Sequence, residues 1–265
     1  MNNMKKVLIT GAAGGIGLAT VKYLSNNGYY VYAFDIKEIE PMQNVESFKC
    51  DLTNSKEIKE IHDKLYKETK IDAVIHFSGM YLMDSLIEIK EEDLKKIFDV
   101  NFFSVYLINK YFIDMLNPNS KIIITSSEVA PLDPLPFNGI YSLTKSTIEH
   151  YAVSLRQELN LINIKVIILR PGAIQTSLLN DSIKSVERLE KETKLYHSNA
   201  SKFKSIVEKN ESKTIEPIKI SKIVFKILKK KNPKLLYKTN INKKLVLLSI
   251  LPKRLQLKII KNLLK

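Results

Sequence analysis

The sequence predicts an α/β fold built on a doubly wound parallel sheet, and three observations support this prediction. Short apolar strands alternate with amphipathic helices from residue 5 to about residue 169. A glycine-rich turn joins the first strand to the first helix. With 265 residues, 45% of them hydrophobic, the chain is long enough to bury one sizeable core. We therefore expect a single domain over residues 1–265.

The expected elements follow one another in a regular order. The strand signals are Lys5–Thr10, Tyr30–Asp35, Val45–Cys50, Asp72–His76, Lys121–Thr125 and Lys165–Leu169. Between them we expect a helix that ends near Asn26 and helices over Ser55–Lys67, Lys90–Leu116 (with room for a break near its start) and Tyr141–Leu161. In a parallel sheet of this kind, ligands bind at the carboxyl ends of the strands.

The pattern changes after Arg170. Residues 180–210 are polar and helical in character, and we expect them to form a helical lid over the substrate site. The tail, residues 240–265, alternates lysine with isoleucine and leucine, which predicts basic amphipathic helices. The favoured interpretation is that they cover the substrate cleft or pack on the sheet. Peripheral membrane contact through this tail is the minor alternative.

Composition excludes several classes of protein. The net charge is +14, but only four of the 42 basic residues are arginine and no recognition motif accompanies them, so we expect no nucleic-acid partner. The single cysteine, Cys50, excludes an intrachain disulfide and favours a reducing compartment. No apolar run approaches the ~20 residues that span a bilayer. We expect a cytoplasmic protein and no metal site.

The glycine turn predicts a dinucleotide site of the Rossmann type. Glycines at positions 11, 15 and 17 let the backbone approach a pyrophosphate, and the helix that follows directs free N–H groups at it. Asp35 ends the second strand, where a carboxylate can accept hydrogen bonds from both ribose hydroxyls of the adenosine. The same charge would repel a 2′-phosphate, so NAD is favoured over NADP.

Tyr141 and Lys145 are four residues apart, so they share one face of a helix. A fixed ammonium there favours the phenolate, and we expect it to lower the tyrosine pKa from about 10 toward neutrality. The same spacing occurs at Tyr106 and Lys110 in this lysine-rich chain. The Tyr141 pair is distinguished by Ser126-Ser127, which follows a strand at the ligand-binding edge of the sheet.

These motifs, in this order, resemble the short-chain dehydrogenase/reductase family on its ordinary, non-extended branch. The glycine turn matches that family's Thr-Gly-x-x-x-Gly-x-Gly, and Asp51-Leu52 matches its adenine-contacting pair. The resemblance covers residues 5 to about 178. It implies a cofactor held by Gly11, Gly15, Ile16, Gly17, Asp35, Asp51, Leu52, Gly79, Tyr141, Lys145, Pro171, Gly172, Ile174 and Thr176.

Within that set, Ile174 and Thr176 would hold the nicotinamide carboxamide. One segment departs from the family pattern: His76-Phe-Ser-Gly79 stands where the family has Asn-Asn-Ala-Gly, so only Gly79 is kept. We interpret His76 as a partly buried strand-end histidine and not as a catalyst.

The resemblance also implies four catalytic residues: Asn101, Ser127, Tyr141 and Lys145. Tyr141 would exchange a proton with the substrate oxygen, Ser127 would orient that oxygen, and Lys145 would bind the nicotinamide ribose. Asn101 would hold a water in the proton path. The serine lies fourteen residues before the tyrosine, whereas the family commonly has thirteen, so Ser126 stays open as the alternative.

The implied function is NAD-dependent hydride transfer to or from a small-molecule secondary alcohol or ketone. Basic apolar tails in that family favour a hydrophobic substrate that is lipid-, steroid- or retinoid-like. The resemblance also implies a homodimer or homotetramer. Two alternatives stay open: a non-enzymatic dinucleotide sensor or scaffold, and an extended-type sugar-nucleotide epimerase, whose glycine pattern Gly14 would also satisfy.

Overall fold

The computed structural model describes residues 4–67, 69–210 and 214–265. Among these residues, seven strands form one parallel sheet in the order β3-β2-β1-β4-β5-β6-β7. The strands are β1 (Lys5–Thr10), β2 (Tyr29–Asp35), β3 (Val45–Lys49), β4 (Ile71–His76), β5 (Leu116–Thr125), β6 (Lys165–Pro171) and β7 (Leu236–Thr239). The predicted doubly wound α/β fold is confirmed.

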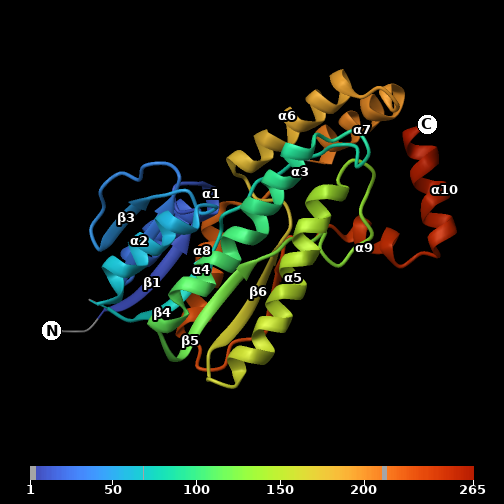
Figure 1. The fold of residues 1–265 in the computed structure, drawn as a ribbon. Coiled ribbons are helices and arrows are strands. Elements are labelled where there is room, and N and C mark those ends of the chain that lie inside the picture. The colour runs from blue at the N-terminus through green and yellow to red at the C-terminus, as the bar shows by residue number, and fades with distance from the viewer. Residues whose placement is uncertain (1–3, 68, 211–213) are drawn as a thin grey trace.

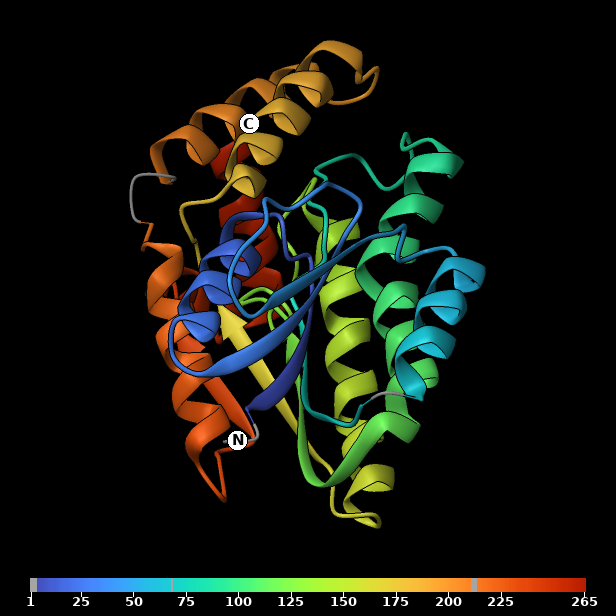
Figure 2. The same ribbon diagram turned by 90° about the vertical axis from the view of Figure 1, so that its left-hand side faces the viewer.

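Helices cover both faces of the sheet (Figures 1 and 2). One face carries α2, α4 and α5, and the other carries α1 and α8. The helices are α1 (Gly15–Ser25), α2 (Ser55–Tyr66), α3 (Glu91–Phe98), α4 (Ser104–Phe112), α5 (Gly139–Asn160), α6 (Ser177–Glu192), α7 (His197–Asn210), α8 (Pro217–Lys229), α9 (Lys243–Ser249) and α10 (Lys253–Leu264).

The central strands are apolar without a break because both of their faces are buried. In β1, the Leu8 side chain packs into the core under α2, α4 and α5, while Val7 and Ile9 pack into the core under α1 and α8. A parallel sheet between two helical layers requires this pattern, since no face of the strand meets water. The same requirement explains why four strands near the middle read as continuous apolar runs.

The strand order reverses beside β1. The chain runs outward from β1 to β3 and then returns to β4 on the other side of β1. Loops that leave β1 and β4 therefore diverge, and they open a crevice at the carboxyl ends of these strands. We expect the candidate cofactor-binding and catalytic residues to lie at this edge of the sheet.

Two features differ from the sequence prediction. The strand β7 was not expected, because it is only four residues long, lies at the sheet edge and contains Lys238. The predicted helix Lys90–Leu116 consists of α3 and α4 joined by a π-helical turn over Asp99–Phe103, and it gives way to β5 at Leu116. This stretch, which the structure describes throughout, has no break near its start; the irregularity is the π-helical turn in its interior, which carries Asn101.

The two helices α6 and α7 stand above the carboxyl edge of the sheet (Figure 1). The helical structure predicted for residues 180–210 is confirmed, although α6 already begins at Ser177, and the role of these helices as a substrate lid stays a prediction. The tail is confirmed as helical in α9 and α10, which lie on the opposite side of the molecule from β3 and α2.

Candidate active site

The glycine turn after β1 is shaped by contacts that no side chain would permit. Gly11 has φ +66°, a left-handed conformation, and a Cβ placed on Gly17 would lie only 1.9 Å from the Gly11 carbonyl oxygen. The helix cap at Gly14 has no side-chain hydrogen bond, which leaves the first N–H groups of α1 available to an anion. The turn therefore fits a dinucleotide pyrophosphate.

Asp35 lies beside this turn, at the end of β2. One carboxylate oxygen accepts a hydrogen bond from the Ala13 backbone N–H and the other from the Lys37 N–H, both at 2.9 Å. These two bonds fix the carboxylate in place, and each oxygen still has an acceptor site to offer. This geometry fits a ribose diol.

Asp51 and Leu52 follow β3 in a tight loop. The Asp51 carboxylate accepts hydrogen bonds from the N–H and the hydroxyl of Thr53, both at 2.8 Å, while Leu52 is buried. Asn54, and not Asp51, caps the helix that follows. Contact of this pair with adenine stays a prediction.

The segment after β6 closes against the glycine turn. A Cβ on Gly15 would lie 2.4 Å from the Thr176 methyl group, so these two parts of the chain touch. Pro171, Gly172 and Ile174 line the same cavity as Ile16. The structure thus brings the two halves of the expected cofactor site together.

The structure also brings Ser127, Tyr141 and Lys145 together at one cavity of about 310 Å³. The Ser127 and Tyr141 hydroxyls are hydrogen-bonded, and the Lys145 ammonium lies 5.6 Å from the centre of the Tyr141 ring. All three side chains are buried. Burial at a cavity wall shields them from bulk water while leaving them open to a bound ligand.

The two candidate serines, Ser126 and Ser127, have different partners. Ser126 Oγ bonds the Glu149 carboxylate on α5 at 2.8 Å and so is held within the packing of that helix. Ser127 bonds Tyr141 instead. Both serines line the cavity, and the contact with Tyr141 favours Ser127 as the catalytic serine, which stays a prediction.

Asn101 is buried, and its side-chain amide is fully engaged. Its Oδ1 accepts from the Met80 N–H at 2.7 Å, and its Nδ2 donates to the Met80 carbonyl and to the Thr144 hydroxyl. The amide therefore fastens the loop after β4 to α5. A Cβ on Gly79 would stand 3.4 Å from Asn101 Oδ1 and 3.5 Å from Lys145 Nζ, so Gly79 leaves the space these groups need.

The second tyrosine–lysine pair has no such surroundings. Tyr106 is 39% exposed on the outer face of α4, and Lys110 is exposed beside it. The spacing alone is identical in the two pairs, so burial and the Ser127 hydrogen bond distinguish them.

The predicted effect of Lys145 on Tyr141 was wrong for this structure. Burial raises the pKa of Tyr141 to about 12; the Ser127 hydrogen bond opposes this increase, while the charge of Glu128 adds to it. Burial also lowers the pKa of Lys145 to about 8. Removal from water disfavours both charged forms, and this outweighs the expected attraction between them.

Glu128 is a pocket residue that the sequence pattern did not reveal, because an acid in a loop ordinarily points to solvent. It lines the cavity, and burial raises its pKa. Its Oε2 accepts a hydrogen bond of 2.5 Å from the Asn242 N–H at the start of α9. Adjacency to the serine pair was the only signal of its position.

His76 is more buried than expected. Its exposed fraction is 2%, and Nε2 lies 3.0 Å from the Asn109 Oδ1. Burial lowers its pKa to about 4, so the ring is neutral at physiological pH. Among the described residues that line the cavity, His76 is not included, and this agrees with a structural role for it.

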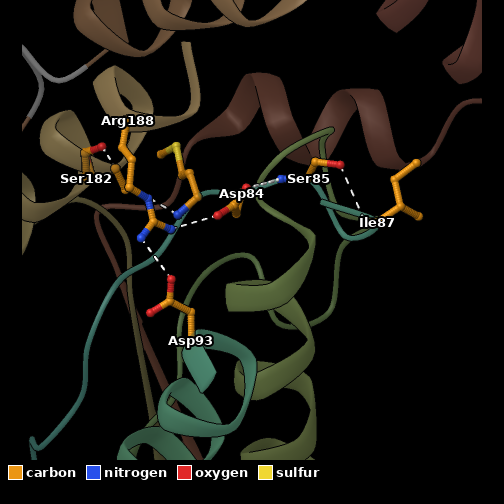
Figure 3. Close-up of polar contacts among 8 residues, drawn as sticks. Asp84, Ser85, Ile87, Asp93, Ser182 and Arg188 are labelled. Atoms are coloured by element: carbon orange, nitrogen blue, oxygen red, sulfur yellow. Dashed lines mark hydrogen bonds and ion pairs between the residues drawn. The ribbon is translucent and has the colours of Figure 1, made fainter. Parts of the chain in front are cut away.

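The lid is tied to the body by Arg188 of α6 (Figure 3). Its guanidinium donates to the Asp84 carboxylate at 2.7 Å and to Asp93 on α3 at 2.9 Å. The Met83 N–H donates to the Ser185 hydroxyl in the same region. These bonds hold α6 over the cavity.

The reversed strand order and the glycine turn place this protein among the Rossmann-type dinucleotide-binding proteins. A family model described as short chain dehydrogenase matches residues 5–187. Because this match covers more than half of the chain, the protein belongs to the short-chain dehydrogenase family.

Relatives and solved structures agree with this assignment. The chain is 28% identical over 229 residues to 3-ketodihydrosphingosine reductase of Bacteroides thetaiotaomicron, covering 86% of this chain and 84% of that protein. It is 29% identical to NADPH-dependent 1-acyldihydroxyacetone phosphate reductase of Schizosaccharomyces pombe, covering 67% of this chain and 62% of that one. A short chain dehydrogenase family protein from Francisella tularensis superposes with a TM-score of 0.74 at 25% identity, covering 89% and 96% of the two chains.

A first prediction concerns the cost of burying Lys145. Lys145→Met should stabilise the ligand-free protein at pH 7 by on the order of 1–3 kcal/mol, because the wild-type ammonium is charged and buried there. The folded pKa of about 8 lies below the ordinary 10.5, so wild-type stability should rise with pH between these values. Urea unfolding at pH 7 and at pH 10.5 measures this, and the gap between the two proteins should shrink at the higher pH. An unchanged gap would contradict it.

A second prediction concerns the lid. Arg188→Met removes both ion pairs and leaves Asp84 half-buried without its cation, so α6 should open more often. Hydrogen exchange of α6 amides should become about tenfold faster, as expected for a loss of roughly 1.4 kcal/mol. Lys59→Met is the matched control, since it breaks an exposed ion pair with Asp63 on α2. Equal exchange of α6 in both variants would show that Arg188 does not hold the lid.

Proposed function

We propose that this protein reduces a ketone on an apolar, lipid-like small molecule to a secondary alcohol, with NAD(P)H as the hydride donor. The observation that carries the proposal is the Ser127–Tyr141 hydrogen bond beside Lys145 on the wall of a largely apolar cavity. This cavity continues from the glycine turn to the lid, so a nicotinamide and a ketone can meet in it.

The cofactor supplies the hydride, and the protein supplies the proton and the orientation. Ser127 and Tyr141 would both donate hydrogen bonds to the ketone oxygen, on which negative charge develops as the hydride arrives. Tyr141 would then transfer its proton to that oxygen. Lys145 would bind the nicotinamide ribose and favour proton return to the tyrosine.

The raised pKa of Tyr141 supports the reductive direction. With a pKa of about 12, the hydroxyl carries its proton at neutral pH and can act as a general acid. Alcohol oxidation would need the phenolate, which burial disfavours. Oxidation should therefore become faster as the pH rises.

The lining of the cavity supports an apolar substrate. Most of its exposed wall is apolar and includes Met80, Met83, Phe203, Ile206, Val207 and Leu245, while Glu128, Asn138, Ser182 and Asn242 add polar groups. The apolar part of this wall gains free energy from burying hydrocarbon. Two relatives described above are named 3-ketodihydrosphingosine reductase and 1-acyldihydroxyacetone phosphate reductase. These names also support a lipid-like ketone as the substrate.

We also propose a homodimer or homotetramer in the cytoplasm. The outer faces of α4, of the π-helical turn before it and of α5 expose apolar side chains, namely Phe103, Tyr106, Leu143 and Val153. A second copy packed on these two helices would cover them.

A third prediction tests the chemistry. Tyr141→Phe should bind the cofactor as the wild type does but lose turnover by about 10²–10⁴-fold, because the proton donor is gone. Tyr106→Phe is the matched control, since it removes the hydroxyl of the exposed pair. Reduction of a long-chain aliphatic ketone, followed by NAD(P)H absorbance, is the measurement. Near-normal turnover of Tyr141→Phe would refute the role given to Tyr141, whereas a wild type that binds the cofactor without any turnover would favour the sensor or scaffold alternative.

A fourth prediction concerns cofactor choice. We propose NAD over NADP, because Asp35 places a negative charge where a 2′-phosphate would lie. Asp35→Ser should weaken NADH binding and strengthen NADPH binding, with a change of about tenfold or more in the ratio of their dissociation constants. Titration of each reduced cofactor by its fluorescence measures the ratio. A wild type that prefers NADPH would refute the role given to Asp35.

A further inference from the structure

The net positive charge of this protein comes from its C-terminal part. Residues 1–216 contain 27 basic and 28 acidic residues, so their charges nearly cancel. Residues 217–265 contain 15 basic residues and no acidic one, and they account for the whole excess. Seven of these cations, all exposed, lie in the last two helices or directly after them: Lys243, Lys244, Lys253, Arg254, Lys258, Lys261 and Lys265.

The same two helices expose large aliphatic side chains. We call residues 240–265, which contain α9 and α10, the C-terminal arm. The exposed fractions are 61% for Leu247, 72% for Ile250, 68% for Leu257 and 59% for Leu263. An amphipathic helix that only packs on the protein would turn such residues inward. In this structure they are exposed to solvent, and so are the cations of the same helices.

The inner side of the C-terminal arm is already used. Leu245 lines the substrate cavity, and Leu264 is buried where α10 packs on α7. Asn199 of α7 donates a hydrogen bond to the Leu264 carbonyl, and the Asn242 N–H bonds Glu128. The C-terminal arm therefore stands at the rim of the cavity, at the outer edge of the molecule (Figure 1).

We propose that the C-terminal arm docks this protein on the surface of an anionic lipid bilayer. The exposed leucines and isoleucine would enter the region between headgroups and acyl chains, and the seven cations would meet the lipid phosphates. None of the described helices is long and apolar enough to cross a membrane, which leaves contact along the surface. This inference does not depend on the reaction proposed above.

The charge of the C-terminal arm, together with its exposed aliphatic side chains, favours an anionic bilayer over a second copy of this chain and over a nucleic acid. A second copy docked symmetrically through the C-terminal arm would bring lysines against lysines, with no acid in either arm to offset them. A nucleic acid would satisfy the cations but would leave Leu247, Ile250 and their neighbours in water. An anionic bilayer offers both negative charge and an apolar interior at one surface.

The test is co-sedimentation of the full-length protein with vesicles. We expect binding to vesicles that contain phosphatidylglycerol, little binding to pure phosphatidylcholine, and weaker binding as salt rises. Replacing Arg254, Lys258 and Lys261 by Gln should reduce the partition coefficient about 100-fold, or about fivefold per cation. Leu247→Asn with Ile250→Asn should reduce it about tenfold or more.

A matched control separates the arm from net charge. Lys22, Lys56 and Lys67 are exposed on or beside α1 and α2, far from the C-terminal arm, and their replacement by Gln removes the same charge. This variant should bind the anionic vesicles within about twofold of the wild type. The proposal is overturned if the wild type does not sediment with anionic vesicles, or if the control loses as much binding as the arm variant. It is also overturned if the two Asn substitutions leave vesicle binding unchanged and instead dissociate an oligomer in light scattering.

Discussion

The removal of Tyr141 and Lys145 from water is the constraint on which the site depends. Desolvation favours the neutral form of both groups: it raises the pKa of Tyr141 to about 12 and lowers the pKa of Lys145 to about 8. The side chains can stay there only because the surrounding structure holds them: Ser127 bonds the phenol, and the packing of α5 against the sheet buries both. The stability given up at this point keeps the Tyr141 hydroxyl protonated at the wall of the cavity.

Asn101 shows how the rest of the fold serves this pair. Its amide joins the loop after β4 to α5, and the π-helical turn brings it to that position. The fold thus uses a local irregularity in a long helix to bring three separate elements to one point. A regular helix through the same residues would turn the side chain to another face.

Periodicity and glycine spacing were sufficient to predict the sheet, the glycine turn and the lid. They succeeded because these features are local: the apolar runs, Gly11 to Gly17, and a polar helical stretch. Burial is not local, so the pKa shifts of Tyr141 and Lys145 were missed, as was the choice between Ser126 and Ser127. Glu128 and β7 were invisible for a related reason, since both are defined by partners far along the chain.

The bond between Glu128 and Asn242 joins residues 114 positions apart. It makes the electrostatics of the catalytic pocket depend on where the last two helices lie. If α9 moved away, the Glu128 carboxylate would lose the hydrogen bond from Asn242. The pKa of Tyr141 would then change as well, because the charge of Glu128 contributes to it. The acidity of the Tyr141 hydroxyl therefore depends both on the carboxyl edge of the sheet and on the position of α9.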